Sequence, residues 1–278
     1  MLRIISDTST LYSTAQAKEA GFRVAPLSVT IADKTYREFD EIDSKTFADL
    51  VRQGNMPRSS QPAIGEVLEI FEEYPEDEII NIAMAQGLSG TYDSAVSAAN
   101  SCEHKDRITV INSRTLCGPH RYLVEQASKM AQAGKSKDEI LAWLNKRMDS
   151  AKSYLMPNDF DFLRRGGRLS PLVSYVGKTI KLAPVMTQSD DGGKLVAAGI
   201  KRNFKQAIEF VREALVRKGV GKGWKIYVTH ADAKELADQA VEILKKELDD
   251  ASFELHMLSP AFITQGGPGC VAVQVVEE

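Results

Sequence analysis

The sequence predicts an α/β protein with two domains, an N-terminal Rossmann-like domain built on a parallel sheet and a smaller C-terminal α+β domain. Its 278 residues are about twice the length of a usual domain. The first half alternates short β-like runs with amphipathic segments, which is the order of a parallel sheet flanked by helices. After Pro157 two strand-like runs are joined by a glycine-rich turn, which indicates antiparallel pairing. We therefore place the domains at residues 1–155 and 156–278.

Three strand-like runs in the first half are expected to form the parallel sheet: residues 2–6, 79–85 and 108–111. Between the first two runs, residues 26–31 and 35–39 flank the turn Ala32-Asp33-Lys34. This spacing predicts a small hairpin that leaves the parallel sheet and returns to it.

Two helices in the same region are indicated by their end signals. Ser44 stands in a cap position and Gly54 follows the last turn, so residues 44–53 are expected to be helical. Pro62 cannot donate a hydrogen bond and suits the first turn of a helix that runs to about residue 74.

A capping box, Ser136-Lys137-Asp138-Glu139, starts a further helix that continues through about residue 150. In the second domain, residues 185–188 and a strand ending near residue 198 flank the turn Asp190-Asp191-Gly192-Gly193. Two further helices are expected from their apolar faces, one formed by Phe204, Ile208, Val211 and Leu215 and the other by Leu236, Ala240, Ile243 and Leu244. Three further strands are expected at residues 226–229, 253–258 and 271–276.

The composition excludes several classes of protein. A net charge of -3 leaves no basic excess to follow phosphates, so nucleic acid is not expected as a partner. Charge comes too early at the N-terminus for a signal peptide, and there is no apolar run of the roughly 18 residues that a membrane span needs. Three widely spaced cysteines fit a reducing cytoplasm better than a disulfide framework.

Small polar residues follow each predicted parallel strand, at the sheet edge where ligands of such folds bind. They are Asp7-Thr8-Ser9, Gln86 to Thr91, and Asn112-Ser113. A helix is expected to begin at Thr91, so the free N–H groups of its first turn and its dipole favour an anion beside Ser89 and Gly90. The alternative is that Ser89 and Thr91 only cap this helix.

A second hydroxyl cluster, Ser59-Ser60-Gln61-Pro62, leads into the helix whose first turn is expected to hold Pro62. Ser60 or Gln61 would be its cap if the cluster is purely structural. Ser59 would act together with Ser89 only if the two loops converge.

Three catalytic or metal motifs are incomplete. Gly177-Lys178-Thr179 resembles the end of a P-loop, but Leu172 stands where the first glycine belongs. Thr91 stands where a nucleophile elbow around Ser89 needs its last glycine. Cys117 and His120 have a metal-like gap but no second pair, so no metal site is predicted.

Two further segments also have simple structural interpretations. Arg164 to Arg168 is typical of a solvated helix end, and Gln265 to Gly269 of a tight turn.

Taken in order, these segments resemble the DegV family over nearly the whole chain. The matching segments are Asp7 to Leu11, Ser59-Ser60-Gln61-Pro62, Leu88 to Ala95, Asn112-Ser113, Gly166 to Ser170, His230-Ala231-Asp232 and Gly267-Pro268-Gly269. Each segment alone is weak evidence, but seven in register are specific. Three positions depart from the family pattern: Ser59 replaces a threonine, Asn112 an aspartate, and Gln265 a histidine.

The resemblance implies a cytoplasmic bacterial carrier that holds one long-chain fatty acid, of the palmitate or oleate class, between its two domains. It implies that Ser59 and Ser89 meet the carboxylate, with Ser60, Gly90 and Thr91 in the same loops. Arg168 and the departing Gln265 would complete the head-group network.

The resemblance also implies that the carrier itself has no catalytic activity, cofactor or metal. It would present the acid to a separate fatty acid kinase that makes an acyl-phosphate, with Arg202 docking the kinase. Two other functions remain open at this point: a serine hydrolase with Ser89 as nucleophile and His230 as base, and a lipid-sensing regulator.

Overall fold

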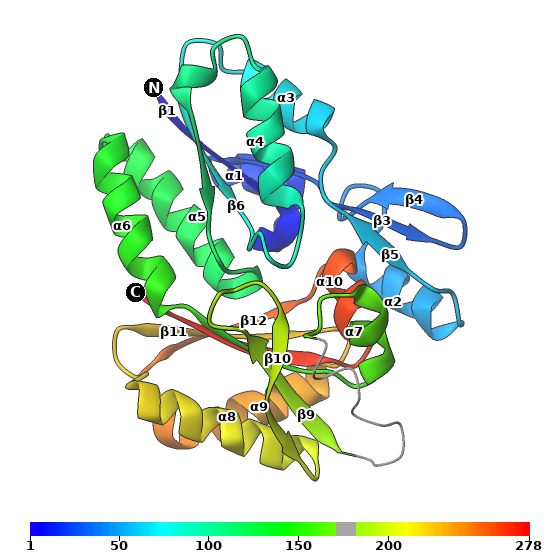
Figure 1. Ribbon diagram of the computed structural model, residues 1–278. Helices are drawn as coiled ribbons and strands as arrows, with labels where there is room; N and C mark the ends of the chain where they lie inside the picture. The colour runs from blue at the N-terminus through cyan, green and yellow to red at the C-terminus, as the bar shows by residue number, and fades with distance from the viewer. Residues whose placement is uncertain (171–181) are drawn as a thin grey trace.

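The structure is a computed structural model that describes residues 1–170 and 182–278, and it confirms the predicted α/β architecture (Figure 1). The P-loop-like Gly177-Lys178-Thr179 lies outside the described residues. Two large sheets form separate layers, with helices between them and on their outer faces. In the described parts of the chain, no helix has both the length and the apolar character needed to cross a bilayer.

The N-terminal sheet has four parallel strands in the order β2-β1-β6-β7. Their bounds are Leu2–Asp7 (β1), Arg23–Ala25 (β2), Glu78–Ala83 (β6) and Ile108–Asn112 (β7). The three predicted strands are confirmed. The edge strand β2 was not predicted, because three residues are too few to show a period of two.

Helices cover both faces of this sheet. They are α1 (Thr14–Glu19), α5 (Cys117–Gln132) and α6 (Lys137–Ser150) on one face, and α3 (Ile64–Glu72) and α4 (Thr91–Ser101) on the other. Successive strand residues point to opposite faces, so Ile4 packs in the core with α5 while Ile5 packs in the core with α3 and α4. The strands are therefore apolar on both sides, as a buried parallel sheet requires.

The structure confirms one of the predicted helix N-caps and corrects two others. The capping box of α6 is confirmed, with Ser136 and Glu139 each bonded to the other's backbone N–H. For α2 (Ser44–Arg52) the predicted serine cap was wrong: the preceding Asp43 caps the helix through Thr46 N at 2.9 Å. Neither Ser60 nor Gln61 caps α3, whose N-cap is Ala63 with no side-chain bond.

Ser59 and Ser60 belong instead to a third strand of the small antiparallel sheet. Its strands are β3 (Ser28–Ile31), β4 (Lys34–Arg37) and β5 (Arg58–Ser60), in the order β4-β3-β5. The predicted hairpin is confirmed. Ala32 and Asp33 both have positive φ, at 48° and 60°, as a two-residue hairpin turn of type I′ requires.

The second large sheet has six strands in the order β10-β9-β8-β13-β11-β12, all antiparallel except the parallel pair β11 and β12. The strands are β8 (Lys152–Met156), β9 (Ala183–Gln188), β10 (Leu195–Lys201), β11 (Trp224–His230), β12 (Ser252–Met257) and β13 (Val271–Glu277). The predicted antiparallel pair of β9 and β10 is confirmed. A division of the chain at residue 155 falls inside β8.

One face of the six-stranded sheet is covered by α8 (Phe204–Lys218) and α9 (Lys234–Leu248). Two short helices lie beside each other near the small sheet: α7 (Phe160–Gly166) and α10 (Pro260–Gly266). The predicted helical face of α8 is buried at Ile208, Val211 and Leu215. The opposite face of the sheet is directed toward the N-terminal domain.

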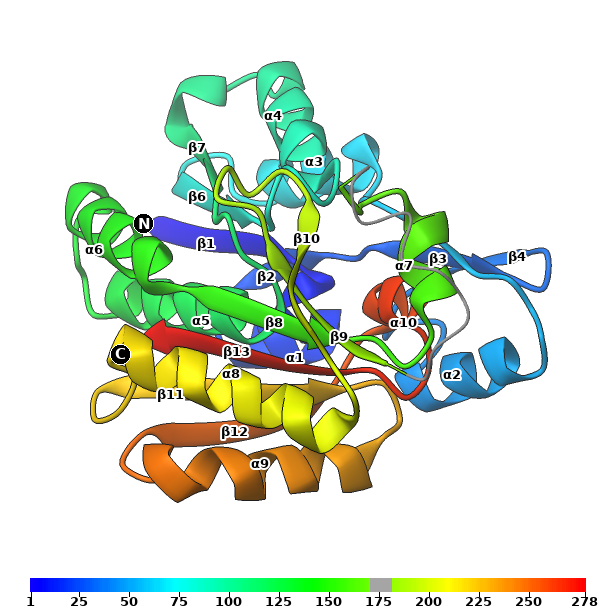
Figure 2. The same ribbon diagram turned by 60° about the horizontal axis from the view of Figure 1, so that its bottom comes forward.

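Helix α5 joins the two domains because it packs on both large sheets, and Figure 2 shows it between β1 and β13. Gly118 lies so close to the ring of Tyr227 that a Cβ at this position would overlap it. Gln274 of β13 accepts a hydrogen bond from Gly118 N at 3.2 Å and donates one to Leu116 O at 3.0 Å. The first turn of α5 is thus bonded to the second domain as well as to its own.

Candidate functional site

A pocket lies where the two domains meet, at the carboxyl edge of the parallel sheet. The N-terminal domain lines it with β5 and the loops that follow β6 and β7, and the C-terminal domain with β8, β9, α7 and α10. The space between these side chains, including the part open to solvent, is about 960 Å³. Pockets that bind small molecules are often found where two domains meet.

Most of the pocket wall is apolar. Its apolar lining includes Leu116, Leu155, Leu163, Met186 and Phe262, which come from both domains. Such a wall favours a hydrocarbon group over a sugar or a nucleotide.

The two predicted hydroxyl loops do converge at one end of this pocket. Ser59, Ser60, Gln61 and Ser89 all line it. The side-chain amide of Gln61 packs against Gly90, where an added Cβ would lie 3.2 Å from Gln61 Cδ. A larger residue at position 90 would therefore push the loops apart.

Ser89 is held by the start of α4. Its Oγ lies 2.8 Å from Thr91 Oγ1 and accepts a hydrogen bond from Thr91 N at 3.3 Å. The N-cap residue of α4 is Gly90, which has no side chain to cap the helix. Ser89 therefore satisfies one N–H of the first turn and also lines the pocket.

A hydrogen bond from Gln265 joins α10 to β5 at this end of the pocket. Gln265 Nε2 donates to Ser59 Oγ at 3.1 Å, so the two predicted site residues are in direct contact. Gln265 Oε1 is buried and has no hydrogen-bond partner within the described ranges. Gln265 and Gly266 end α10 rather than forming a turn by themselves, and the turn begins at Gly267.

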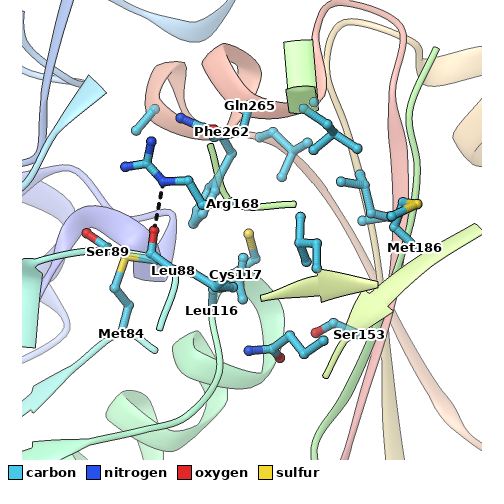
Figure 3. Close-up of a pocket in the computed structure, with 18 of the residues that line it drawn as sticks. Met84, Leu88, Ser89, Leu116, Cys117, Ser153, Arg168, Met186, Phe262 and Gln265 are labelled. Atoms are coloured by element: carbon cyan, nitrogen blue, oxygen red, sulfur yellow. Dashed lines mark hydrogen bonds between the residues drawn. The ribbon is translucent and has the colours of Figure 1, made fainter. Parts of the chain in front are cut away.

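Arg168 also belongs to this end of the pocket (Figure 3). Gly167 ends α7 in the left-handed conformation at φ 71°, which lets the chain fold back. Arg168 then donates through Nε to Leu88 O at 3.2 Å and through Nη1 to Gly166 O. Arg164 and Arg165 instead pair with Asp161 at the surface, as expected of a solvated helix end.

Two predicted residues lie away from this cluster. Arg202 is exposed between β10 and α8, outside the pocket. His230 is buried, and its Nδ1 accepts a hydrogen bond from Ala233 N at 3.2 Å. His230 is not among the residues that line the pocket with Ser89, so the described residues give the hydrolase interpretation no support.

Glu38 was missed by the sequence analysis, although it holds α10 in place. Its buried carboxylate accepts hydrogen bonds from Thr8 Oγ1 and from Ala261 N, the latter at 2.9 Å. Burial raises the pKa of Glu38 to about 7. Because Ala261 lies in the first turn of α10, Glu38 anchors the helix that carries Gln265 to the site.

Two buried cysteines, Cys117 and Cys270, line the pocket from opposite domains. Burial raises the pKa of both thiols, that of Cys270 to about 12, so they stay protonated and act as small apolar wall residues. Among residues 1–170 and 182–278, no three His, Cys, Asp or Glu side chains are grouped so that they could hold a metal ion.

Fold and pocket together define a two-domain α/β protein with a mainly apolar cavity enclosed between its domains. The chain belongs to the DegV family, since the family model described as "Uncharacterised protein, DegV family" matches residues 1–278. The resemblance found in the sequence is thereby confirmed.

Similar proteins are found both by sequence and by structure. A DegV domain-containing protein of Caldanaerobacter subterraneus is 30% identical over 275 residues, which cover 98% of this chain and 97% of the relative. The crystal structure of DegV, a fatty acid binding protein from Bacillus subtilis, is 26% identical with a TM-score of 0.86, covering 100% of this chain and 99% of that one. A DegV family protein from Thermus thermophilus, whose fatty acid binding was studied, is 24% identical with a TM-score of 0.89 and the same coverage.

The raised pKa of Glu38 predicts a pH dependence of stability. The ordinary value is 4.5 and the folded value is about 7, so between them the folded protein keeps a proton that the unfolded chain has released. The free energy of unfolding therefore falls as the pH rises from 4.5 to about 7, and the loss persists above pH 7. Glu38→Gln should abolish this loss, which we expect to be about 3 kcal/mol.

Urea unfolding of both proteins at pH values on either side of this window measures the effect. Glu69→Gln, at an exposed position of α3, is the matched control and should keep the wild-type profile. If the Glu38→Gln variant and the wild type change in parallel with pH, Glu38 does not titrate in this range.

Proposed function

We propose that this protein binds one long-chain fatty acid non-covalently in the pocket, with its carboxylate at Ser59 and Ser89. The observation that carries the proposal is a mainly apolar wall with several hydroxyl and amide side chains and the Arg168 guanidinium together at one end. The fatty acid binding ascribed to DegV from Bacillus subtilis, which has the same fold along its whole length, supports it.

Most of the binding free energy is expected to come from burial of the hydrocarbon tail. Burying a tail of about 16 carbons contributes roughly 0.8 kcal/mol per methylene, or about 10 kcal/mol before the costs of binding are subtracted. A hydrogen bond to a charged group adds only about 1.5–3 kcal/mol. The polar end is still required, because a carboxylate buried without donors pays a heavy desolvation penalty.

The hydrogen bonds of the free protein leave the right donors for a carboxylate. Ser59 Oγ accepts from Gln265, so the Ser59 proton is available to the ligand. Ser89 Oγ accepts from Thr91 N, and its proton is available to the ligand when Thr91 Oγ1 is the donor in the 2.8 Å contact between the two hydroxyls. Ser60, Gly90 and Thr91 complete the two loops, and Arg168 supplies a positive charge beside them.

We further propose that the protein is a cytoplasmic carrier and that the chemistry takes place on a separate fatty acid kinase. Arg202 is the proposed docking residue. It is exposed at the start of α8, so a partner could reach it without entering the pocket.

The first test is whether the purified recombinant protein contains lipid. We expect native mass spectrometry to show about one long-chain fatty acid per chain, because contact between the apolar wall and water is unfavourable and a hydrocarbon tail removes it. Denaturation and extraction should release the acid unchanged. Apo protein that takes up neither palmitate nor oleate would exclude the proposed function.

The second test concerns the carboxylate. Ser89→Ala should weaken fatty acid binding by about 1–3 kcal/mol, because a bond to a charged acceptor is lost. A fatty alcohol of equal length should bind almost equally well to both proteins. Ser97→Ala, at an exposed position of the same helix, should change neither ligand. Equal losses for acid and alcohol would mean that Ser89 only shapes the pocket.

The third test concerns the partner. Arg202→Ala should slow acyl phosphorylation by a cognate kinase severalfold at limiting carrier concentration, while fatty acid binding stays intact. Lys222→Ala removes an equally exposed positive charge beyond the far end of α8 and should have no effect. A normal rate for the Arg202 variant would reduce Arg202 to an ordinary surface charge.

A further inference from the structure

A second polar group lines the pocket away from the carboxylate end. Ser153 of β8 pairs with Gln274 of β13 in the antiparallel ladder, so their side chains share one face of the sheet. The next residue, Tyr154, points to the other face, into the core beneath α8 and α9. Figure 3 shows Ser153 across the pocket from Arg168 and Gln265.

The orientation of the Gln274 amide is set by backbone groups of α5. Its Oε1 accepts from Gly118 N at 3.2 Å, and its Nε2 donates to Leu116 O at 3.0 Å. A flipped amide would place donor against donor and acceptor against acceptor. The remaining N–H of Gln274 therefore must donate to Ser153 Oγ, at 2.9 Å.

This contact leaves the Ser153 proton unused. Ser153 cannot donate back to Gln274, whose oxygen is occupied, and no acceptor for its proton is found in the described part of the chain. A plain alkyl chain offers no acceptor either. Burying this hydroxyl against an unsubstituted tail therefore leaves a donor unsatisfied, which is unfavourable.

Gln188 supplies the complementary group. It follows Thr187, which pairs with Tyr154, so Gln188 stands next to Ser153 on the pocket face. Its Nε2 donates to Arg114 O at 3.4 Å, and its Oε1 receives no hydrogen bond from any residue that the structure describes. Ser153 thus offers a donor and Gln188 an acceptor on neighbouring strands.

We propose that the pocket selects a long-chain fatty acid with a hydroxyl group on its chain, remote from the carboxylate. This hydroxyl accepts a hydrogen bond from Ser153 Oγ and donates one to Gln188 Oε1. A keto group would use only the donor, and a double bond would use neither. The inference rests on the proposed function, since it concerns the tail of the same ligand.

The experiment compares stearate with a set of hydroxystearates whose hydroxyl lies at successive positions from mid-chain to the terminal carbon. Delipidated full-length protein is titrated with each acid by calorimetry. Relative to stearate, one isomer should bind about tenfold more tightly than the other isomers, which is the net effect of one to two hydrogen bonds. In Ser153→Ala, which leaves only the contact to Gln188, most of this preference should be lost, while stearate binds at least as tightly as before.

Two further variants control for packing. Leu155→Ala enlarges the pocket beside the same face of β8. It should weaken the binding of all acids by a similar factor and leave the preference for one isomer unchanged. Ser153→Thr keeps the hydroxyl and should retain part of the preference.

Each outcome decides the question. Binding of stearate with no preference among the isomers, or a preference that is undiminished in Ser153→Ala, overturns this inference and leaves the proposed function standing. In the first of these cases a water molecule satisfies Ser153. Failure of every acid to bind overturns both.

Discussion

The first turn of α5 lies directly on the six-stranded sheet, and this contact sets the positions of both domains around the pocket. Gly118 is close enough to the Tyr227 ring to exclude any side chain, and Gln274 bonds to the backbone on either side of Cys117. The packing contact acts only at short range, and the hydrogen bonds also require a particular direction. The two sheets therefore cannot slide past each other without losing these interactions. Leu116 and Cys117, at the start of this helix, line the pocket. The distance between the pocket walls therefore depends on the same turn.

The pocket separates two tasks that follow different physics. Its apolar middle acts through area, and many small changes there are tolerated because the hydrophobic effect has no direction. Its polar end acts through geometry, since Ser59, Ser89 and Gln265 must point at one group. Glu38 supports that geometry from outside the pocket by holding the first turn of α10.

Elements with local signals could be predicted from the sequence, and elements defined by distant contacts could not. The capping box at Ser136 and the hairpin turn at Asp33 depend on neighbouring residues only, and both were predicted. Helix α5 begins with Cys117-Gly118-Pro119 and has no side-chain cap, so no local sequence signal predicts where it starts.

The same limit applies to the site. The convergence of Ser59 with Ser89 depends on the pairing of β5 with β3, which no local pattern encodes. Glu38 looks like one more surface charge in the sequence. Gln274 did leave a signal, a lone amide inside the apolar run of β13, and buried polar residues of this kind are normally bonded. The loop that follows β6 also meets the second domain at a glycine. Gly87 packs on the backbone of Gly192 and Gly193, in the turn between β9 and β10. A Cβ at position 87 would overlap the backbone of the turn, so any other residue there would push the two domains apart. Glycine at this position is therefore required by the spacing of the domains, independently of any contact with a ligand.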